Sequence, residues 1–119
     1  MYIKEIVCAD KEDSEADVII SDGVYTIKCY MYPVTDVLIN QKINVIYAFE
    51  CTDIMRVQSI KYEIKKLQGY YAYIIVAKVI NRKEKLICVG EIIIKLDAEI
   101  SKDINDGDYI KASVVRFDC

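Results

Sequence analysis

The sequence predicts an all-β protein, built as a single small antiparallel barrel. Short runs rich in Ile, Val and Tyr recur along the 119 residues with turn residues between them, which gives seven or eight predicted strands. A chain of this length has room for one domain with one core. Because no internal repeat or linker divides it, we expect one domain over residues 1–119.

The first half of the chain contains the clearest local signal, a β-hairpin. Asp22-Gly23 separates two β-rich runs, and glycine tolerates the positive φ that a two-residue hairpin turn requires. Side chains of the second run alternate between two faces until Pro33 ends it. In chain order we expect a strand over 2–8, an acidic loop over 10–17, the hairpin over 18–32, a loop over 34–42 and a strand over 43–49.

Residues 54–67 are compatible with two structures. Their apolar residues fall at helical spacing, with Asp53 as an N-cap and Gly69 near a C-cap. Ile60 and Tyr62 also alternate with charged residues, as they would in a strand. The alternative fold is therefore α+β, with one helix at about 54–67 packed on the sheet.

The second half contains the strongest predicted strands, over 70–80 and 86–96, joined by a charged connection. Both strands are apolar on both faces, which is typical of a strand that is covered on both sides. A polar connection over 97–107 and a final strand over 108–118 follow. The surplus apolar surface of the 70–96 segment leaves self-association as a further possibility.

Composition excludes the commonest catalytic sites. The chain has no histidine, so Ser-His-Asp and Cys-His catalysis are excluded. Glu50 and Glu91 lie within or beside apolar strands and are the carboxylates that could perform acid–base chemistry, but their spacing does not show that they converge. We therefore expect a protein without enzymatic activity.

Neither a metal nor a cofactor is predicted. The five cysteines are widely spaced and form no C-x-x-C pair, and we expect Cys8, Cys29 and Cys88 to be small core residues rather than zinc ligands. Residues 103–108 have some likeness to a calcium loop, but its fifth position is glycine and its twelfth is valine. The absence of a glycine-rich phosphate loop agrees with this expectation.

The sequence also predicts the compartment. The longest uncharged apolar stretch, 70–77, is far shorter than the ~20 residues that a membrane-spanning helix needs. Residues 1–8 include Lys4 and Glu5 and lack the apolar run of a signal peptide. We expect a cytoplasmic protein with no membrane partner.

Charge is unevenly distributed along a chain whose net charge is −3. Residues 1–55 hold four basic and ten acidic side chains, whereas residues 56–95 hold nine basic and three acidic ones. A solvated loop would explain the acidic residues, but they could also dock on a basic protein, because charge complementarity speeds association. The predicted protein-binding residues are this acidic patch and two tyrosines: Asp10, Glu12, Asp13, Glu15, Asp17, Tyr71 and Tyr73.

The basic middle of the chain supports a second hypothesis, binding of single-stranded nucleic acid. Such binding combines cations along the backbone path with aromatic faces for the bases. Tyrosines packed in the sheet beside solvated lysines would explain the same residues, and the overall acidity weighs against phosphate binding. The predicted nucleic-acid-binding residues are Lys61, Lys65, Lys66, Tyr71 and Tyr73.

Four segments carry a resemblance to a known kind of protein. The runs INDGDYI (104–110), VRFD (115–118), SDGVY (21–25) and VGEI (89–92) resemble segments of uncharacterised small bacterial OB-like β-barrel domains. The resemblance covers about half of the chain, favours a strand over 59–66 and implies no activity. Some such domains accompany toxins as immunity proteins. The lack of a catalytic or metal set, the acidic surface and the surplus apolar strand area lead us to expect a protein-binding module, and the resemblance suggests the inhibitor or immunity type.

Overall fold

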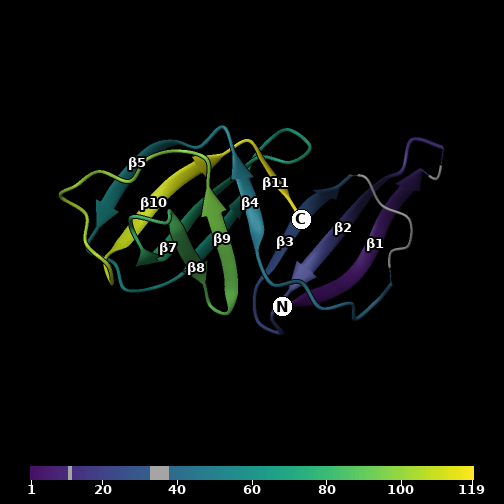
Figure 1. The fold of residues 1–119 in the computed structure, drawn as a ribbon, viewed down its shortest axis with the longest axis horizontal. Coiled ribbons are helices and arrows are strands. Elements are labelled where there is room, and N and C mark those ends of the chain that lie inside the picture. Colours follow the sequence, from purple (N-terminus) through teal and green to yellow (C-terminus); the bar gives the residue numbers. More distant parts are fainter. Residues whose placement is uncertain (11, 33–37) are drawn as a thin grey trace.

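The computed structural model describes residues 1–10, 12–32 and 38–119, and the described residues form strands and no helix (Figure 1). The predicted all-β class is confirmed. The alternative with a helix at 54–67 is wrong, because this segment forms two strands that pair with different partners. The predicted loop over 34–42 and the end of the hairpin at Pro33 lie partly or wholly outside the described residues.

Eleven strands are present in the described residues. They are β1 (Tyr2–Asp10), β2 (Glu15–Ser21), β3 (Thr26–Met31), β4 (Ile46–Phe49), β5 (Thr52–Val57), β6 (Glu63–Lys66), β7 (Tyr73–Asn81), β8 (Leu86–Val89), β9 (Ile92–Leu96), β10 (Tyr109–Val114) and β11 (Arg116–Asp118).

These strands form one mixed sheet in the order β1-β2-β3-β11-β4-β9-β8-β7-β10-β5, with β6 paired to β7. The pairs β3–β11 and β4–β9 are parallel and the others are antiparallel. Strands β1 to β3 form an N-terminal arm, and β4 to β10 form a curled main body beside it (Figure 1). Because no ladder between β4 and β5 joins the two ends of the main body in the described residues, the sheet is not a closed barrel.

The core runs through both parts and follows the alternation of the strands. In β2 and β3, Val18, Ile20, Ile27 and Cys29 are fully buried, whereas Ile19, Lys28 and Tyr30, which alternate with them, are only partly buried. Phe117 of β11 is also fully buried, so the strand between the arm and the main body contributes a large ring to the core. No helix of the described chain could cross a membrane.

Several predicted boundaries differ from the observed ones. The loop between β2 and β3 has four residues rather than two, because the Asp22 carboxylate accepts hydrogen bonds from the N–H groups of Val24 and Tyr25 at 2.9 and 2.8 Å and so holds a wider turn. The predicted strand over 86–96 is two strands, since Gly90 adopts a φ of +60° and reverses the chain. The predicted acidic loop over 10–17 is shorter than expected, since Asp10 ends β1, residues 12–14 form a turn and residues 15–17 begin β2.

Candidate functional site

One face of the sheet gathers aromatic and charged side chains at the junction of the arm and the main body. Tyr30 of β3 pairs with both Asp17 of β2 and Asp118 of β11. Asp118 and Arg116 pair in turn with Tyr47 and Phe49 of β4. Because directly paired residues point to the same face of a sheet, these side chains share the face opposite to the core.

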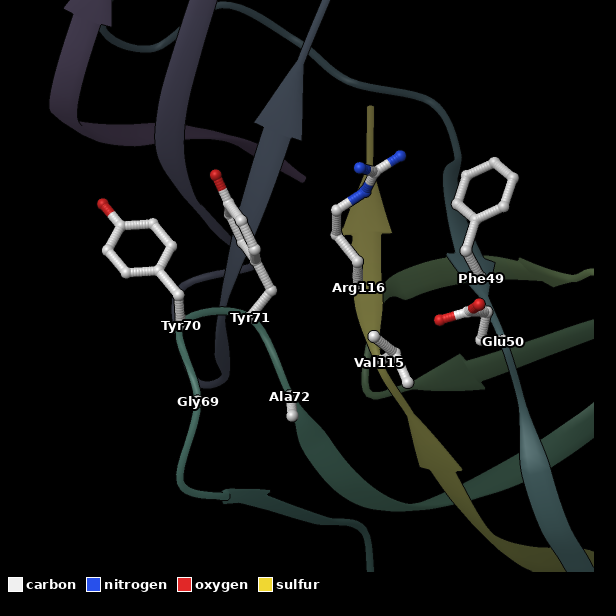
Figure 2. A pocket seen from close by; sticks show the side chains of 8 residues that line it. All are labelled: Phe49, Glu50, Gly69, Tyr70, Tyr71, Ala72, Val115 and Arg116. Carbon is white, nitrogen blue, oxygen red and sulfur yellow. The ribbon is translucent and has the colours of Figure 1, made fainter.

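A cleft of about 550 Å³ lies on this face. Tyr70 and Tyr71 stand on one side of it and Phe49 and Glu50 on the other, with the β11 side chains between them (Figure 2). Its volume is in the range of known ligand-binding clefts. The lining residues are Phe49, Glu50, Gly69, Tyr70, Tyr71, Ala72, Val115 and Arg116.

Arg116 is held in one orientation. Its Nε and Nη2 atoms donate to the two carboxylate oxygens of Asp118 at 2.6 and 2.9 Å. The guanidinium carbon also lies 4.9 Å from the centroid of the Tyr30 ring and 5.6 Å from that of Phe49. The hydrogen bond and charge of Asp118 raise the pKa of Arg116 against the opposing effect of burial. A bidentate ion pair, flanked by aromatic rings, fixes the orientation of a guanidinium more firmly than a single hydrogen bond would.

On one side of the cleft, Tyr70 and Tyr71 are hydrogen-bonded to the N-terminal arm. Both hydroxyl groups donate to Asp17, at 2.9 Å from Tyr70 and 2.6 Å from Tyr71, and the two rings meet edge to face with their centroids 4.6 Å apart. The ammonium of Lys28 lies 3.3 Å from the centroid of the Tyr70 ring. Burial and the hydrogen bond to Asp17 raise the pKa of Tyr71, so its hydroxyl remains a donor.

The Glu50 side of the cleft is set by a tight turn between β4 and β5. Glu50 has a φ of +53°, a conformation that costs about 1–3 kcal/mol for a residue other than glycine. The Asp97 carboxylate holds this turn by accepting from the N–H groups of Glu50 at 2.7 Å and Cys51 at 3.2 Å. Burial opposes ionisation of Asp97, but these N–H groups outweigh it and lower its pKa. The turn directs the Glu50 carboxylate toward the cleft (Figure 2).

The predicted acidic residues are partly engaged within the chain. Asp10 accepts hydrogen bonds from the N–H groups of Glu12 and Asp13 at 3.0 and 3.3 Å, and Glu15 accepts one from the Tyr30 hydroxyl at 2.9 Å. The charges of Asp10 and Glu15 raise the pKa of Asp13. A small pocket lined by Asp10, Glu15, Ala16, Asp17, Tyr30 and Tyr71 joins this acidic patch to the tyrosine side of the cleft.

The two predicted tyrosines have different surroundings. Tyr71 lines the cleft, whereas Tyr73 is buried, with its hydroxyl accepting a hydrogen bond from the Lys28 N–H at 3.0 Å and its ring against Phe117. Only 7% of Tyr73 is exposed, and the Lys66 ammonium lies 5.4 Å from the centroid of its ring. Lys61 and Lys65 are exposed.

Lys66 lies near the cleft without lining it. Its ammonium donates to the main-chain carbonyls of Leu67 and Gly69, at 2.9 and 2.5 Å. Its side chain lines a separate groove, together with Tyr62 and Tyr73. The two carboxylates considered for acid–base chemistry lie on different turns, Glu50 at the cleft and Glu91 beside Gly90.

Sequence reasoning did not identify the side chains at the centre of the cleft, Phe49, Val115 and Arg116. The alternation of aromatic and small residues in β4 and of charged and aromatic residues in β11 is visible in the sequence, but the pairing of β11 with both β3 and β4 is not. The thiol of Cys51, which follows Glu50 in the chain, is not activated, because burial and a hydrogen bond to Asp97 raise its pKa to about 12. In the described ranges no three potential ligand side chains are grouped to hold a metal ion.

Comparisons of the chain with protein-family models, with curated proteins and with solved structures gave no match. The cleft and the acidic patch are therefore the features from which a function can be inferred.

Proposed function

We propose that this protein is a non-enzymatic protein-binding module of the inhibitor or immunity type, and that its contact surface consists of the cleft and the acidic patch. The observation that supports this most strongly is the gathering of exposed aromatic rings around a fixed arginine. Tyrosine, phenylalanine and arginine are enriched at the centres of protein–protein interfaces, where they supply most of the binding energy.

The exposed fractions of the cleft side chains support the proposal. Phe49 is 39% exposed, Tyr70 52% and Val115 51%, and Tyr47, which shares their face of the sheet, is 43% exposed. Apolar side chains that are exposed singly are common, but a contiguous group of them marks an interaction site. The rings are also held in place by Asp17 and Arg116, so little side-chain entropy is lost on binding.

The acidic patch supports a basic partner. Glu12 and Asp13 are exposed at the tip of the β1–β2 hairpin, and the raised pKa of Asp13 reports repulsion among neighbouring carboxylates. A basic surface would relieve that repulsion and would also be attracted over a distance during encounter. Because the patch adjoins the cleft, one partner could contact both.

For the main body we propose an OB-like barrel geometry. The strand order of the main body, β4-β9-β8-β7-β10-β5, begins and ends with strands that are consecutive in the chain, since β5 starts three residues after β4 ends. A bent β4–β5 segment that contributes to both edges is a common way for a small barrel to approach closure.

The proposal is tested by affinity capture from a lysate of the source cells, followed by quantitative mass spectrometry. The immobilised proteins are the natural chain, Phe49→Ala and the control Ile60→Ala, which removes another exposed apolar side chain. A basic protein retained by the natural chain and by the control, but lost from Phe49→Ala, is the expected result. Identical sets from all three proteins would contradict the proposal.

A titration with labelled single-stranded DNA and RNA distinguishes the other class of function. The proposal expects no saturable binding at low salt, because Tyr73 is only 7% exposed and the Lys66 ammonium is bound to main-chain carbonyls. Saturable binding that weakens steeply with rising salt would replace the protein-binding proposal by nucleic-acid binding.

A further inference from the structure

We propose that the cleft receives the side chain of an arginine from a loop of the protein partner. This inference rests on the proposed function and specifies the chemistry of the contact at its centre. Three features of the cleft carry it: an unpaired carboxylate, three nearby cations that are already engaged within the chain, and aromatic walls above an apolar floor.

The unpaired carboxylate is that of Glu50. It has no ion pair among the described residues, whose salt bridges are Arg56–Asp108, Lys85–Glu99 and Arg116–Asp118. Its position is imposed by a backbone turn of positive φ, which Asp97 stabilises from outside the cleft. A carboxylate that has no partner, on a backbone position that is itself fixed, is suited to a ligand of opposite charge.

The cations of the chain around the cleft are already engaged. Arg116 is paired through two hydrogen bonds with Asp118, and Lys28 lies on the ring of Tyr70. Lys66 is bound to main-chain carbonyls at the Gly69 end, which lies away from Glu50 (Figure 2). The charge that remains free at the Glu50 end of the cleft is therefore negative.

The walls and floor match the rest of an arginine side chain. Val115 and Ala72 offer an apolar surface to its methylene groups, and the rings of Phe49 and Tyr71 stand on opposite sides (Figure 2). Rings on this face already hold cations of the chain itself, as the Arg116 and Lys28 contacts show. A planar guanidinium stacks on aromatic rings and binds a carboxylate through two hydrogen bonds, which a lysine ammonium cannot do.

The test is an NMR titration of the ¹⁵N-labelled protein with N-acetyl-arginine amide. N-acetyl-citrulline amide is the matched probe, since it has nearly the same shape without the charge. We expect saturable shifts of the Glu50, Ala72 and Val115 amides with the arginine probe. In Glu50→Gln its affinity should fall about tenfold, the loss of roughly one charge-assisted hydrogen bond. The control Glu99→Gln, at an exposed carboxylate paired with Lys85, should keep the natural affinity.

Equal binding of the two probes, unchanged affinity in Glu50→Gln, or an absence of shifts at the cleft would each overturn the inference. The two proposals fail in distinguishable ways. A captured protein that depends on Phe49, without arginine binding, overturns this inference and leaves the proposed function standing. Arginine binding at the cleft without any captured protein supports the cation site and contradicts the proposed function.

Discussion

The carboxylate of Asp22 accepts a hydrogen bond of 2.8 Å from the main-chain N–H of Glu91, 69 residues further along the chain. The same carboxylate accepts from Val24 and Tyr25, so one side chain closes the β2–β3 loop and binds it to the turn between β8 and β9. Burial opposes its ionisation, but the three N–H groups prevail and lower the pKa of Asp22. This contact is one of the polar links between the N-terminal arm and the main body.

Gly90→Ala should destabilise the protein strongly. Gly90 has a φ of +60°, and an added methyl group would clash with the Asp22 carboxylate and lie 2.8 Å from the Tyr25 ring. We expect the free energy of unfolding to fall by about 2–4 kcal/mol, from backbone strain and the lost hydrogen bonds. Gly23→Ala is the control, because Gly23 also has a positive φ but has nothing within 4 Å of the added atom. Urea unfolding measures the free energy of unfolding of both variants. Equal losses in Gly90→Ala and Gly23→Ala would show that the Asp22 contact contributes little to stability.

Acid should weaken the protein through Asp22 and Asp97. Each has a folded-state pKa below the ordinary value of 3.8. Their contribution to stability is therefore complete above pH 5 and is lost as the pH falls through 3.8 and below, where the folded carboxylates take up protons. Unfolding in urea at several pH values between 3 and 7 measures this slope. In the variant with Asn at both positions the slope should be smaller, and an unchanged slope would assign the acid sensitivity to other carboxylates.

Phe117→Ala should reduce the free energy of unfolding by about 3–5 kcal/mol, because the ring is fully buried and packs against Tyr73. Val115→Ala, two residues away, removes a side chain that is 51% exposed and should change stability by less than about 1 kcal/mol. Thermal and urea unfolding of both variants measure the difference. Similar losses in the two variants would contradict the placement of β11 with its Phe117 side chain in the core.

Reversing charge at Glu12 and Asp13 should slow association with the captured basic partner by about tenfold at low salt, with little change in dissociation. Both residues are exposed, and neither side chain holds the fold as those of Glu15 and Asp17 do. Stopped-flow mixing of the double lysine variant measures the two rates. The charge-matched control is the double variant Glu84→Lys and Glu99→Lys, at two exposed carboxylates outside the cleft. An association rate that falls equally in the control would reflect net charge alone, and the patch would then have no specific role.

The parts of the fold that depend on near neighbours could be predicted from the sequence. The alternation from Val18 to Cys29 and the turn at Asp22 are local, and the structure has β2 and β3 there. Residues 54–67 could not be decided, because β5 and β6 exist through pairing with β10 and β7. The cleft could not be predicted from the sequence either. Arg116 contacts Tyr30 and Phe49 only because β11 pairs with both β3 and β4.

The place of β11 in the sheet has a consequence for how the chain is made. β11 follows every other strand in the chain, yet it supplies the ladder between β3 and β4. A ribosome therefore synthesises the N-terminal arm long before β11, the strand that joins the arm to the main body. The apolar face of the arm therefore stays uncovered until β11 has been synthesised. During that time the arm depends on a chaperone or on rapid folding to avoid aggregation.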